Sequence, residues 1–246
     1  MENKIIAVWG SPGSGKTITA VKIAKMLSKM KKNTLIVGCD TESPLLPLLM
    51  PARKNAPSLG DLLALPSITG LTVLQHCVPC DKNDNLAVLS YCKGENIRTY
   101  PEYSLQRAGD FISMLYETAD FIVIDCTSHI TIDMLTATAL EKADVTFKVV
   151  NPTIKSISYI QSQKPLLQPS KFRYASQINI INNIMPDQDV APVIDFLGNS
   201  AYCLPNVPAL TNQFDSGKLL DTAFGKNARD YASTMEKMIS EAVLND

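Results

Sequence analysis

The sequence lacks a long apolar run, an excess of charge of either sign, and any repeat or low-complexity linker. No apolar stretch approaches the roughly 18–20 residues that a membrane span needs. The formal net charge of −1 argues against a strongly basic protein that coats nucleic acid, although a local basic patch stays open. The first residues, 1–4, pass straight into an apolar run, so no signal peptide is predicted. We therefore expect a cytoplasmic protein whose six widely spread cysteines are reduced.

The composition supports a large core, with 46% hydrophobic and 19% charged residues in 246. The patterning predicts strands at 4–9, 34–38, 71–74, 120–125, 145–150, 177–182 and near 201–204. It predicts helices at 16–31, 104–118, 131–142, 154–164, 216–222 and 227–243. Strands that alternate with helices indicate an α/β fold: a doubly wound, mostly parallel sheet flanked by helices, in a single domain over 1–246. Residues 76–103 have the weakest pattern and are predicted to be irregular or inserted.

A glycine-rich segment directly follows the first apolar run. It reads Gly10-Ser11-Pro12-Gly13-Ser14-Gly15-Lys16-Thr17 and matches G-x-x-x-x-G-K-[ST] in the strand–loop–helix setting that this motif requires. The loop N–H groups and the start of the next helix favour phosphate. We predict a nucleoside triphosphate site formed by these residues and Ile18; the alternative is a chance glycine-rich turn. Lys16 would reach the β- and γ-phosphates, and the Thr17 hydroxyl would ligate Mg²⁺.

Two aspartates follow predicted strands at the edge where such a ligand would lie. Asp125 ends the apolar run 121–124, the place of a Walker B aspartate that holds Mg²⁺ directly or through water. Asp40 follows the second strand and could orient or deprotonate the water that attacks the γ-phosphate. For both residues the alternative is a capping or loop aspartate.

These segments, in this order, resemble the ParA/MinD family of P-loop ATPases, including its TadZ/CpaE pilus-assembly branch. Residues 35–42 resemble the switch I segment of the family, and 121–128 resemble its Walker B strand and the entry to switch II. The run Ile180-Ile181-Asn182-Asn183 is similar to a late strand whose asparagine reads adenine, which implies that role for Asn182. Residues 204–218, beginning at Leu204-Pro205, resemble the stretch before the last helix and add Pro205 to the nucleotide contacts.

The chain also departs from the family pattern. Most members carry a second lysine that reaches across the dimer to the partner's phosphates, and Ser11 stands at that position. Pro12, in place of glycine, removes one backbone donor. Thr127-Ser128-His129 replaces the usual Pro/Gly-rich run; His129 is either a γ-phosphate sensor or an ordinary loop residue. Because the cation in trans is missing, we predict slow intrinsic hydrolysis, or hydrolysis that depends on a partner.

Three further features have a functional and a plain structural interpretation. One is a set of residues with the spacing of zinc ligands: His76, Cys77, Cys80 and Cys92. The alternative is that these cysteines are reduced thiols that bind no metal. Lys22, Lys25, Lys29 and Lys32 line one helical face that could touch DNA or acidic lipid, although a solvated face is favoured. The last helix has an apolar stripe and a mixed-charge face, so it is expected to pack on the core rather than anchor to a membrane.

The resemblance implies an ATP- and Mg²⁺-binding ATPase that forms a homodimer with ATP and positions a protein partner. That partner would be a pilus or secretion apparatus or a partition component; direct membrane binding is not favoured and nucleic acid is less favoured. Lys16 and Asp40 would be catalytic, and Thr17 and Asp125 would ligate Mg²⁺. Two alternatives stay open: a nearly inactive nucleotide-dependent scaffold, and a small-molecule kinase or synthetase on a related P-loop fold.

Overall fold

The computed structural model describes residues 3–53, 55–81, 83–198 and 201–244. Its described strands form an eight-stranded sheet in the order β3-β4-β2-β5-β1-β6-β7-β8. The strands are β1 (Lys4–Gly10), β2 (Thr34–Gly38), β3 (Val78–Cys80), β4 (Asn83–Ser90), β5 (Phe121–Asp125), β6 (Val145–Val150), β7 (Ile178–Ile184) and β8 (Tyr202–Pro205). The edge strand β3 pairs antiparallel with β4, and the other described pairs are parallel. The predicted doubly wound, mostly parallel sheet is confirmed.

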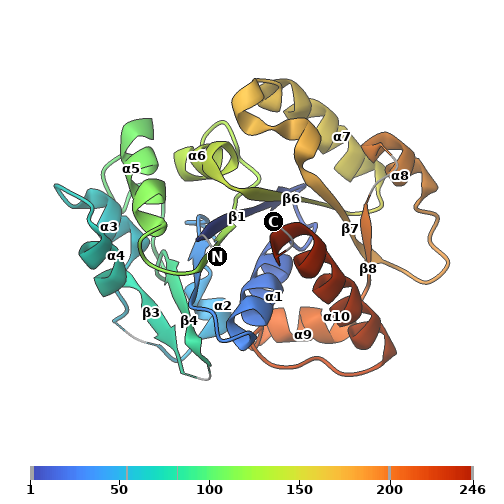
Figure 1. The fold of residues 1–246 in the computed structure, drawn as a ribbon, viewed down its shortest axis with the longest axis horizontal. Helices are drawn as coiled ribbons and strands as arrows, with labels where there is room; N and C mark the ends of the chain where they lie inside the picture. The colour runs from blue at the N-terminus through green and yellow to red at the C-terminus, as the bar shows by residue number, and fades with distance from the viewer. Residues whose placement is uncertain (1–2, 54, 82, 199–200, 245–246) are drawn as a thin grey trace.

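Helices cover both faces of this sheet (Figure 1). They are α1 (Lys16–Lys29), α2 (Leu46–Leu49), α3 (Leu59–Ala64), α4 (Gly70–His76), α5 (Leu105–Leu115), α6 (Met134–Lys142), α7 (Ile154–Gln163), α8 (Ala191–Leu197), α9 (Pro208–Asp215) and α10 (Lys226–Ile239), with short 3₁₀ turns at Lys164–Leu167, Ser170–Phe172 and Tyr174–Ser176 and a π turn at Ser240–Leu244. In Figure 1, α1, α2, α9 and α10 lie below the sheet and α3 to α7 above it.

The central strand β1 shows why the sheet is covered twice. Its alternate residues belong to two separate cores: Ile6 and Val8 pack with α1 and α10, whereas Ile5, Ala7 and Trp9 pack with α5 and α6. A strand that is apolar on both faces is stable only between two layers of helices. The two cores fix β1 at the centre and place its carboxyl end, where the glycine-rich loop begins, at one edge of the sheet.

Most predicted elements are confirmed, but residues 71–74 are helix rather than strand. They lie within α4, whose start is capped by Thr69, with its hydroxyl accepting from the Thr72 backbone N–H. Val73 is buried, whereas Leu71 and Leu74 are 66% and 51% exposed. This one-sided burial suits a short surface helix, and the capping threonine was the signal that the apolar run obscured.

One further prediction is wrong and another holds only in part. The helix predicted at 216–222 lies earlier, as α9, because Pro208 starts it and Gly217, with a φ of 66°, follows its end. The segment 76–103, predicted to be irregular or inserted, is irregular over 91–103, but its first part supplies β3 and β4 to the sheet. The polar start of β4, residues 83–85, concealed a strand whose second half is buried against β2.

The lysine face of α1 is only partly the solvated surface that the sequence favours: Lys29 is exposed, whereas Lys22 and Lys25 are engaged by another part of the chain. Lys22 is 8% exposed, and its ammonium donates to the Leu219 carbonyl and to Gln213 Oε1, at 2.8 Å for the latter. Lys25 donates to the Asp221 carbonyl at 3.0 Å. Burial lowers the pKa of Lys22 to about 7. These two lysines therefore tie α1 to the segment between α9 and α10.

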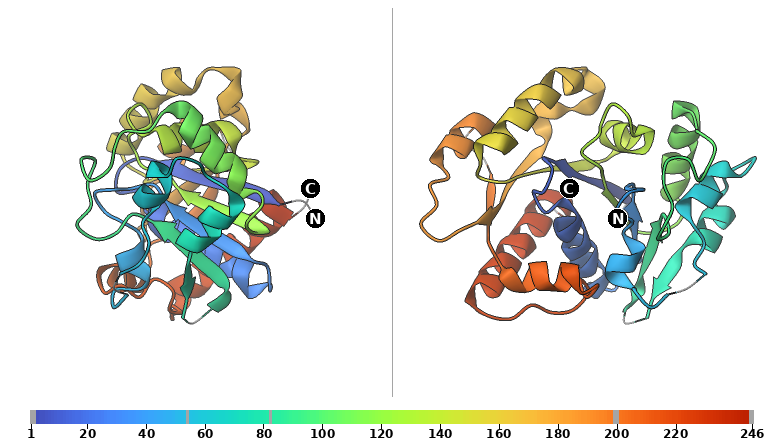
Figure 2. Two further views of the ribbon diagram at one scale, coloured as in Figure 1. Left: turned by 90° about the vertical axis from the view of Figure 1, so that its left-hand side faces the viewer. Right: turned by 180° about the vertical axis from the view of Figure 1, so that it is seen from behind.

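The C-terminal helix packs on the core, as predicted. Ala228, Tyr231, Met235, Met238 and Ile239 are buried on one side of α10. Figure 2 shows α10 and α9 beside α1 when the molecule is seen from behind. Lys4 at the start of β1 donates to the Val243 carbonyl at 2.9 Å, which joins the two ends of the described chain. Within the described residues, no helix is long and apolar enough to cross a membrane.

Candidate nucleotide-binding site

The candidate site lies where neighbouring parallel strands end at one edge of the sheet. Asp125 at the end of β5 is in register with Gly38 at the end of β2 and with Val8 near the end of β1. Cys39 donates its backbone N–H to the Asp125 carbonyl at 3.1 Å. In open α/β sheets, ligands bind outside the carboxyl ends of the strands. The topology therefore brings the glycine-rich loop and both predicted aspartates to one edge.

The glycine-rich loop needs glycine at two positions for different reasons. Gly10 lies against β6, so that a Cβ there would be 1.8 Å from the Val149 carbonyl oxygen. Gly15 has a φ of 85°, and a Cβ on it would be 2.4 Å from Asn182 Nδ2. Gly15 also has no side chain with which to cap α1. The first N–H groups of a helix have no intrahelical acceptor, and because no side chain caps those of α1, they are suited to an anion.

Lys16 points back over this loop. Its ammonium donates to the Ser11 carbonyl at 3.2 Å and to Ser128 Oγ at 2.7 Å. Burial lowers the pKa of Lys16, whereas the nearby Asp125 raises it. The ammonium is thus half-buried and held by neutral oxygens, which a phosphate could replace with stronger charge-assisted bonds.

Asp125 is 6% exposed, and its Oδ1 is buried without a hydrogen-bond partner among the described residues. Burial raises its pKa from 3.8 to about 7, against the lowering effects of the Thr17 hydroxyl and of Lys16. The helix-capping alternative does not apply, since Asp133 caps α6. A buried carboxylate oxygen beside a threonine hydroxyl is a donor set suited to Mg²⁺.

Asp40 lies at the same edge but has a local role in this conformation. Its Oδ1 accepts from the backbone N–H groups of Glu42 and Ser43, at 2.8 and 3.0 Å. This is the capping interaction that the sequence left open. Its part in orienting water stays a prediction, and its side chain would use its other oxygen for that purpose.

Ser11 turns inward rather than toward solvent. It is 1% exposed, and its Oγ lies 2.8 Å from Ser156 Oγ on α7. The backbone N–H of Ser11 donates to the Val149 carbonyl at 3.1 Å. The side chain and the N–H of Ser11 are therefore both engaged within the fold, and its contact with nucleotide stays a prediction.

The burial of Ser11 suggests how to test whether the lysine that it replaces limits the rate of ATP hydrolysis. A lysine at position 11 must leave the contact with Ser156 to reach solvent, at a loss of about 1 kcal/mol in unfolding free energy for the hydrogen bond. Ser11→Ala loses the same bond without adding charge and is the matched control. If the absent cation limits turnover, Ser11→Lys raises the rate of phosphate release from ATP above those of both Ser11→Ala and the wild type. Equal rates for all three would contradict that explanation.

Asn182, predicted to read adenine, and Pro205, predicted to contact the nucleotide, lie on β7 and β8. Asn182 is 3% exposed, and its amide donates to the Ser14 carbonyl at 2.8 Å, so in this conformation it supports the loop. Pro205 ends β8 and is half-buried. Sequence reasoning missed Asn151, whose amide donates to the Gly13 carbonyl at 3.0 Å. An asparagine directly after an apolar strand was the signal that could have found it.

The loop after β5 connects the site to α6. Asp133 caps α6 and accepts from the hydroxyls of Thr136 and Thr127, the latter at 3.3 Å. His129 is exposed, and its backbone N–H donates to Thr127 Oγ1 at 3.2 Å. None of these contacts indicates that the His129 side chain senses a γ-phosphate. Its position fits the plain interpretation, an ordinary loop histidine.

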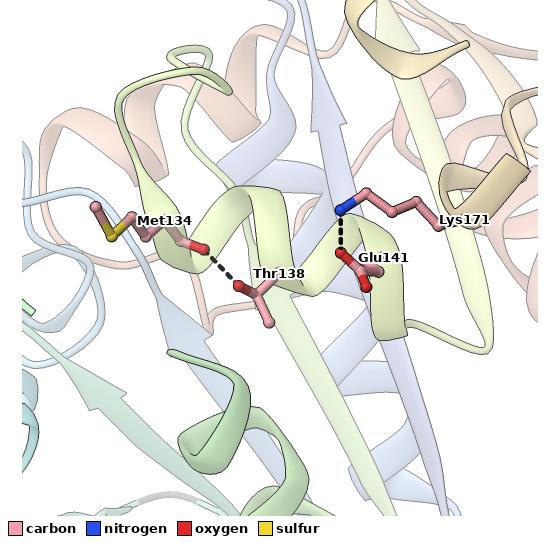
Figure 3. A network of polar contacts seen from close by, with 4 residues as sticks. All are labelled: Met134, Thr138, Glu141 and Lys171. Atoms are coloured by element: carbon pink, nitrogen blue, oxygen red, sulfur yellow. Dashed lines mark hydrogen bonds and ion pairs between the residues drawn. The ribbon is translucent and has the colours of Figure 1, made fainter. Parts of the chain in front are cut away.

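Figure 3 shows two contacts of helix α6, one within the helix and one from its carboxyl-terminal end to a neighbouring turn. Thr138 Oγ1 donates to the Met134 carbonyl at 2.7 Å. Lys171, from the 3₁₀ turn Ser170–Phe172, forms a 2.7 Å ion pair with Glu141. Both side chains of this pair are largely open to solvent, so it adds little to stability.

The cysteines give no support to a zinc site. Among the described residues, no group of three or more His, Cys, Asp and Glu side chains is placed to hold a metal ion. Burial raises the pKa values of Cys77 and Cys80 to about 12, which disfavours the thiolates that zinc requires. The reduced-thiol interpretation is therefore favoured by the geometry.

A mostly parallel sheet with a G-x-x-x-x-G-K-[ST] loop after its central strand, and an aspartate at the neighbouring strand end, is the arrangement typical of P-loop nucleotide-binding proteins. The family model "CobQ/CobB/MinD/ParA nucleotide binding domain" matches residues 5–192. The chain therefore belongs to this ParA/MinD-like family of nucleotide-binding ATPases.

Individual proteins resemble it more distantly. The tyrosine-protein kinase CpsD of Streptococcus pneumoniae is 26% identical over 200 residues, which cover 80% of this chain and 83% of the relative. The 35.5 kDa chain of chlorophyllide reductase from Rhodobacter capsulatus is 33% identical over 69 residues, 28% of this chain and only 20% of the relative. The septum site-determining protein MinD of Pyrococcus horikoshii, complexed with Mg-ADP, shares the fold, with a TM-score of 0.76, 18% identity and coverage of 100% of this chain and 99% of that one.

Proposed function

We propose that this chain is a single-domain ATPase that binds ATP with Mg²⁺, dimerises when ATP is bound and positions a protein partner. The observation that carries the proposal is the presence of two charged groups at one sheet edge: the half-buried Lys16 ammonium, held by neutral oxygens, and the buried Asp125 carboxylate with an unpartnered oxygen. A cation and a carboxylate placed in this way fit the phosphate and the metal of one Mg–nucleotide complex.

Each residue has a distinct part in this proposal. The N–H groups at the start of α1 and the Lys16 ammonium bind the phosphates, and the Thr17 hydroxyl and Asp125 are placed to hold Mg²⁺. When bound, that ion would supply charge neutralisation at the phosphate oxygens. Asp40 orients the attacking water. Because Ser11 provides no cation at the phosphates, we expect turnover to be slow without a partner.

The partner is proposed from the family resemblance. A resemblance to the TadZ/CpaE branch of the family favours a pilus or secretion apparatus as the partner. The alternative is a partition component, through which the protein would position plasmid DNA. The packing of α10 on the core supports a protein partner over a direct membrane contact. The magnesium ion is supported by the Mg-ADP in the MinD relative, which has the same fold.

A second candidate is kinase activity, favoured by the similarity to CpsD over 80% of this chain. Transfer of the γ-phosphate to a tyrosine would label a protein, whereas hydrolysis releases inorganic phosphate. Incubation with γ-labelled ATP separates the two: we expect label in free phosphate, and label retained on protein tyrosine would favour the kinase.

The binding claim is tested with Lys16→Ala. Loss of the ammonium removes charge-assisted bonds worth about 1.5–3 kcal/mol each, so we expect Mg–ATP affinity to fall roughly 100-fold. Isothermal titration measures it. The matched control is Lys29→Ala, which changes an exposed lysine at the other end of α1 and should bind Mg–ATP as tightly as the wild type does. Equal affinity for both variants would contradict the proposed site.

A further inference from the structure

A cavity of about 260 Å³ lies at the edge of the sheet opposite the candidate nucleotide site. It is bordered by the second half of α1, the start of β4 and the segment between α9 and α10, and its lining residues are Lys25, Ser28, Lys29, Asn83, Asn85 and Leu220. The cavity faces the amino ends of the parallel strands, because β4 begins at Asn83, whereas the glycine-rich loop follows the carboxyl end of β1. No Asp or Glu is among these lining residues.

The cavity brings together two lysines from one face of α1. Lys25 and Lys29 are one helical turn apart, a spacing at which like charges repel each other. Burial lowers the pKa of Lys25, and the charge of Lys29 lowers it further, against the raising effect of Asp221. An anion bound between the two ammonium groups would replace this repulsion with attraction to both.

Several hydrogen-bond donors at the cavity are available to a ligand. The Lys25 ammonium has three donors and uses one of them, toward the Asp221 carbonyl at 3.0 Å. The side chain of Lys29 is exposed and makes no hydrogen bond or ion pair with the described residues. The side-chain amide of Asn85 likewise has no hydrogen-bond partner in the described part of the chain, so both of its N–H groups can donate.

The wall between these donors is fixed by hydrogen bonds of its own. Ser28 Oγ accepts from Asn83 Nδ2 at 2.7 Å and donates to the Lys25 carbonyl at 3.0 Å. Asn83 Oδ1 accepts from the backbone N–H of Asn85 at 3.2 Å. The side-chain oxygens of Ser28 and Asn83 are therefore already engaged, and the cavity offers mainly donors. Because this wall is ordered before binding, little further ordering is needed to hold a ligand.

We propose that this cavity binds the phosphoryl group of a small soluble molecule, held by the ammonium groups of Lys25 and Lys29 and by the Asn85 amide. A phosphate monoester carries about 1.5 to 2 negative charges at pH 7, which suits two lysines better than the single charge of a carboxylate does. Lysine binds phosphate as a point charge. The site is separate from the nucleotide site, and its existence does not rest on the proposed function.

The size and one wall of the cavity indicate what accompanies the phosphate. Small-molecule sites have volumes of about 300–1,000 Å³, so a cavity of about 260 Å³ suits a ligand at the small end of that range. Leu220 supplies an apolar wall, which a short organic group beside the phosphate could contact. A small organic phosphate such as glycerol 3-phosphate is therefore the appropriate probe.

The test is a titration of the nucleotide-free protein with glycerol 3-phosphate, followed through backbone amide chemical shifts. We expect saturable shifts within 25–29 and 83–85 and at Leu220. Lys25→Gln and Lys29→Gln should each weaken binding about tenfold, because each removes one charge-assisted contact. The matched control is Lys31→Gln, which removes the same charge just beyond α1 from an exposed residue that does not line the cavity. It should bind the probe as the wild type does.

The position of the shifts distinguishes this site from the glycine-rich loop. Probe that enters the loop shifts amides within 10–17, and Lys16→Ala should weaken those shifts while it leaves the shifts at the cavity unchanged. Thermal unfolding shows whether each variant is folded, and Lys29→Gln, at an exposed position, serves if Lys25→Gln is not folded.

Two results would overturn the inference. The first is shifts confined to 10–17, or equal affinities of Lys25→Gln, Lys29→Gln and Lys31→Gln for the probe, because the cavity would then not be a phosphoryl site. The second comes from sedimentation with vesicles that contain phosphatidate. If the protein sediments with these vesicles and does not respond to glycerol 3-phosphate, the phosphoryl group belongs to a lipid headgroup and the soluble ligand is excluded.

Discussion

Gly10→Ala should lower the free energy of unfolding by at least about 3 kcal/mol, or prevent the chain from folding. The added methyl carbon would lie 1.8 Å from the Val149 carbonyl oxygen, 2.7 Å from its carbonyl carbon and 2.8 Å from its nitrogen. All three are backbone atoms of β6, so no side chain can turn away to make room. To relieve the clash, β1 and β6 must separate where Gly10 pairs with Val149.

The same shift would break the bond from the Ser11 N–H to the Val149 carbonyl, which sets the path of the glycine-rich loop. Nucleotide binding should therefore be lost together with stability. Gly13→Ala is the matched control: its φ is 70°, but a Cβ there would meet nothing within 4 Å. We expect it to lose only about 1–2 kcal/mol, the strain of a left-handed conformation. Urea unfolding measures both, and similar losses would contradict the packing described at Gly10.

Asp125→Asn should remove a pH dependence from the stability of the metal-free protein. Burial raises the pKa of this carboxyl from 3.8 to about 7, so the folded state holds its proton more tightly than the unfolded state. Wherever the folded state binds more protons, the free energy of unfolding falls as the pH rises. The stability associated with this group is therefore greatest in acid and declines between about pH 4 and pH 7.

The size of the effect follows from the difference in proton affinity. Each tenfold step is worth about 1.4 kcal/mol, so the wild type should lose roughly 2–3 kcal/mol relative to Asp125→Asn between about pH 5 and pH 8. Without nucleotide or Mg²⁺, the asparagine variant should be the more stable of the two at the higher pH, because it has no buried charge. Urea unfolding at the two pH values, compared between the variant and the wild type, cancels the contributions of other groups. Parallel pH profiles would contradict the buried ionisation of Asp125.

The same variant should bind Mg–ATP tenfold or more weakly, since a carboxylate placed for the metal is replaced by a neutral amide. If Asp125→Asn is more stable than the wild type without ligand but binds Mg–ATP more weakly, the buried charge of Asp125 serves ligand binding rather than stability. A capping aspartate would show loss of stability at every pH instead. Asp133→Asn removes a carboxylate that does cap α6 and should cost stability through its lost cap hydrogen bonds, but burial also raises the pKa of Asp133, so it does not serve as a pH-independent control.

The sequence was sufficient for the parts of the site that depend on local spacing. The glycine-rich loop could be read because its residues are consecutive, and Asp125 because it ends an apolar run whose strand must lie in the sheet centre. The strand β4 was missed since its first residues are polar and only its second half is buried. Its place in the sheet depends on pairing with β2, which no local pattern records.

Contacts between distant residues were beyond the reach of the sequence. Lys22 was interpreted as solvated because its helix face is polar, yet that face is covered by a segment about 200 residues further along the chain. Tyr159 lies on α7 and Ser128 lies in the loop after β5, 31 residues earlier, so no local pattern indicates that they are in contact. The inward orientation of the Ser11 side chain likewise depends on its contact with Ser156. The sequence shows that serine replaces the lysine of the family, but it does not show where the serine side chain points.

The measurement that most directly tests the central claim is the solution mass, by sedimentation or light scattering, in Mg–ATP, in Mg–ADP and without nucleotide. We predict a dimer with ATP and a monomer in the other two states. Lys16→Ala should remain monomeric throughout, and Lys29→Ala should behave as the wild type does. A mass that is the same in all three states would contradict an ATP-dependent dimer.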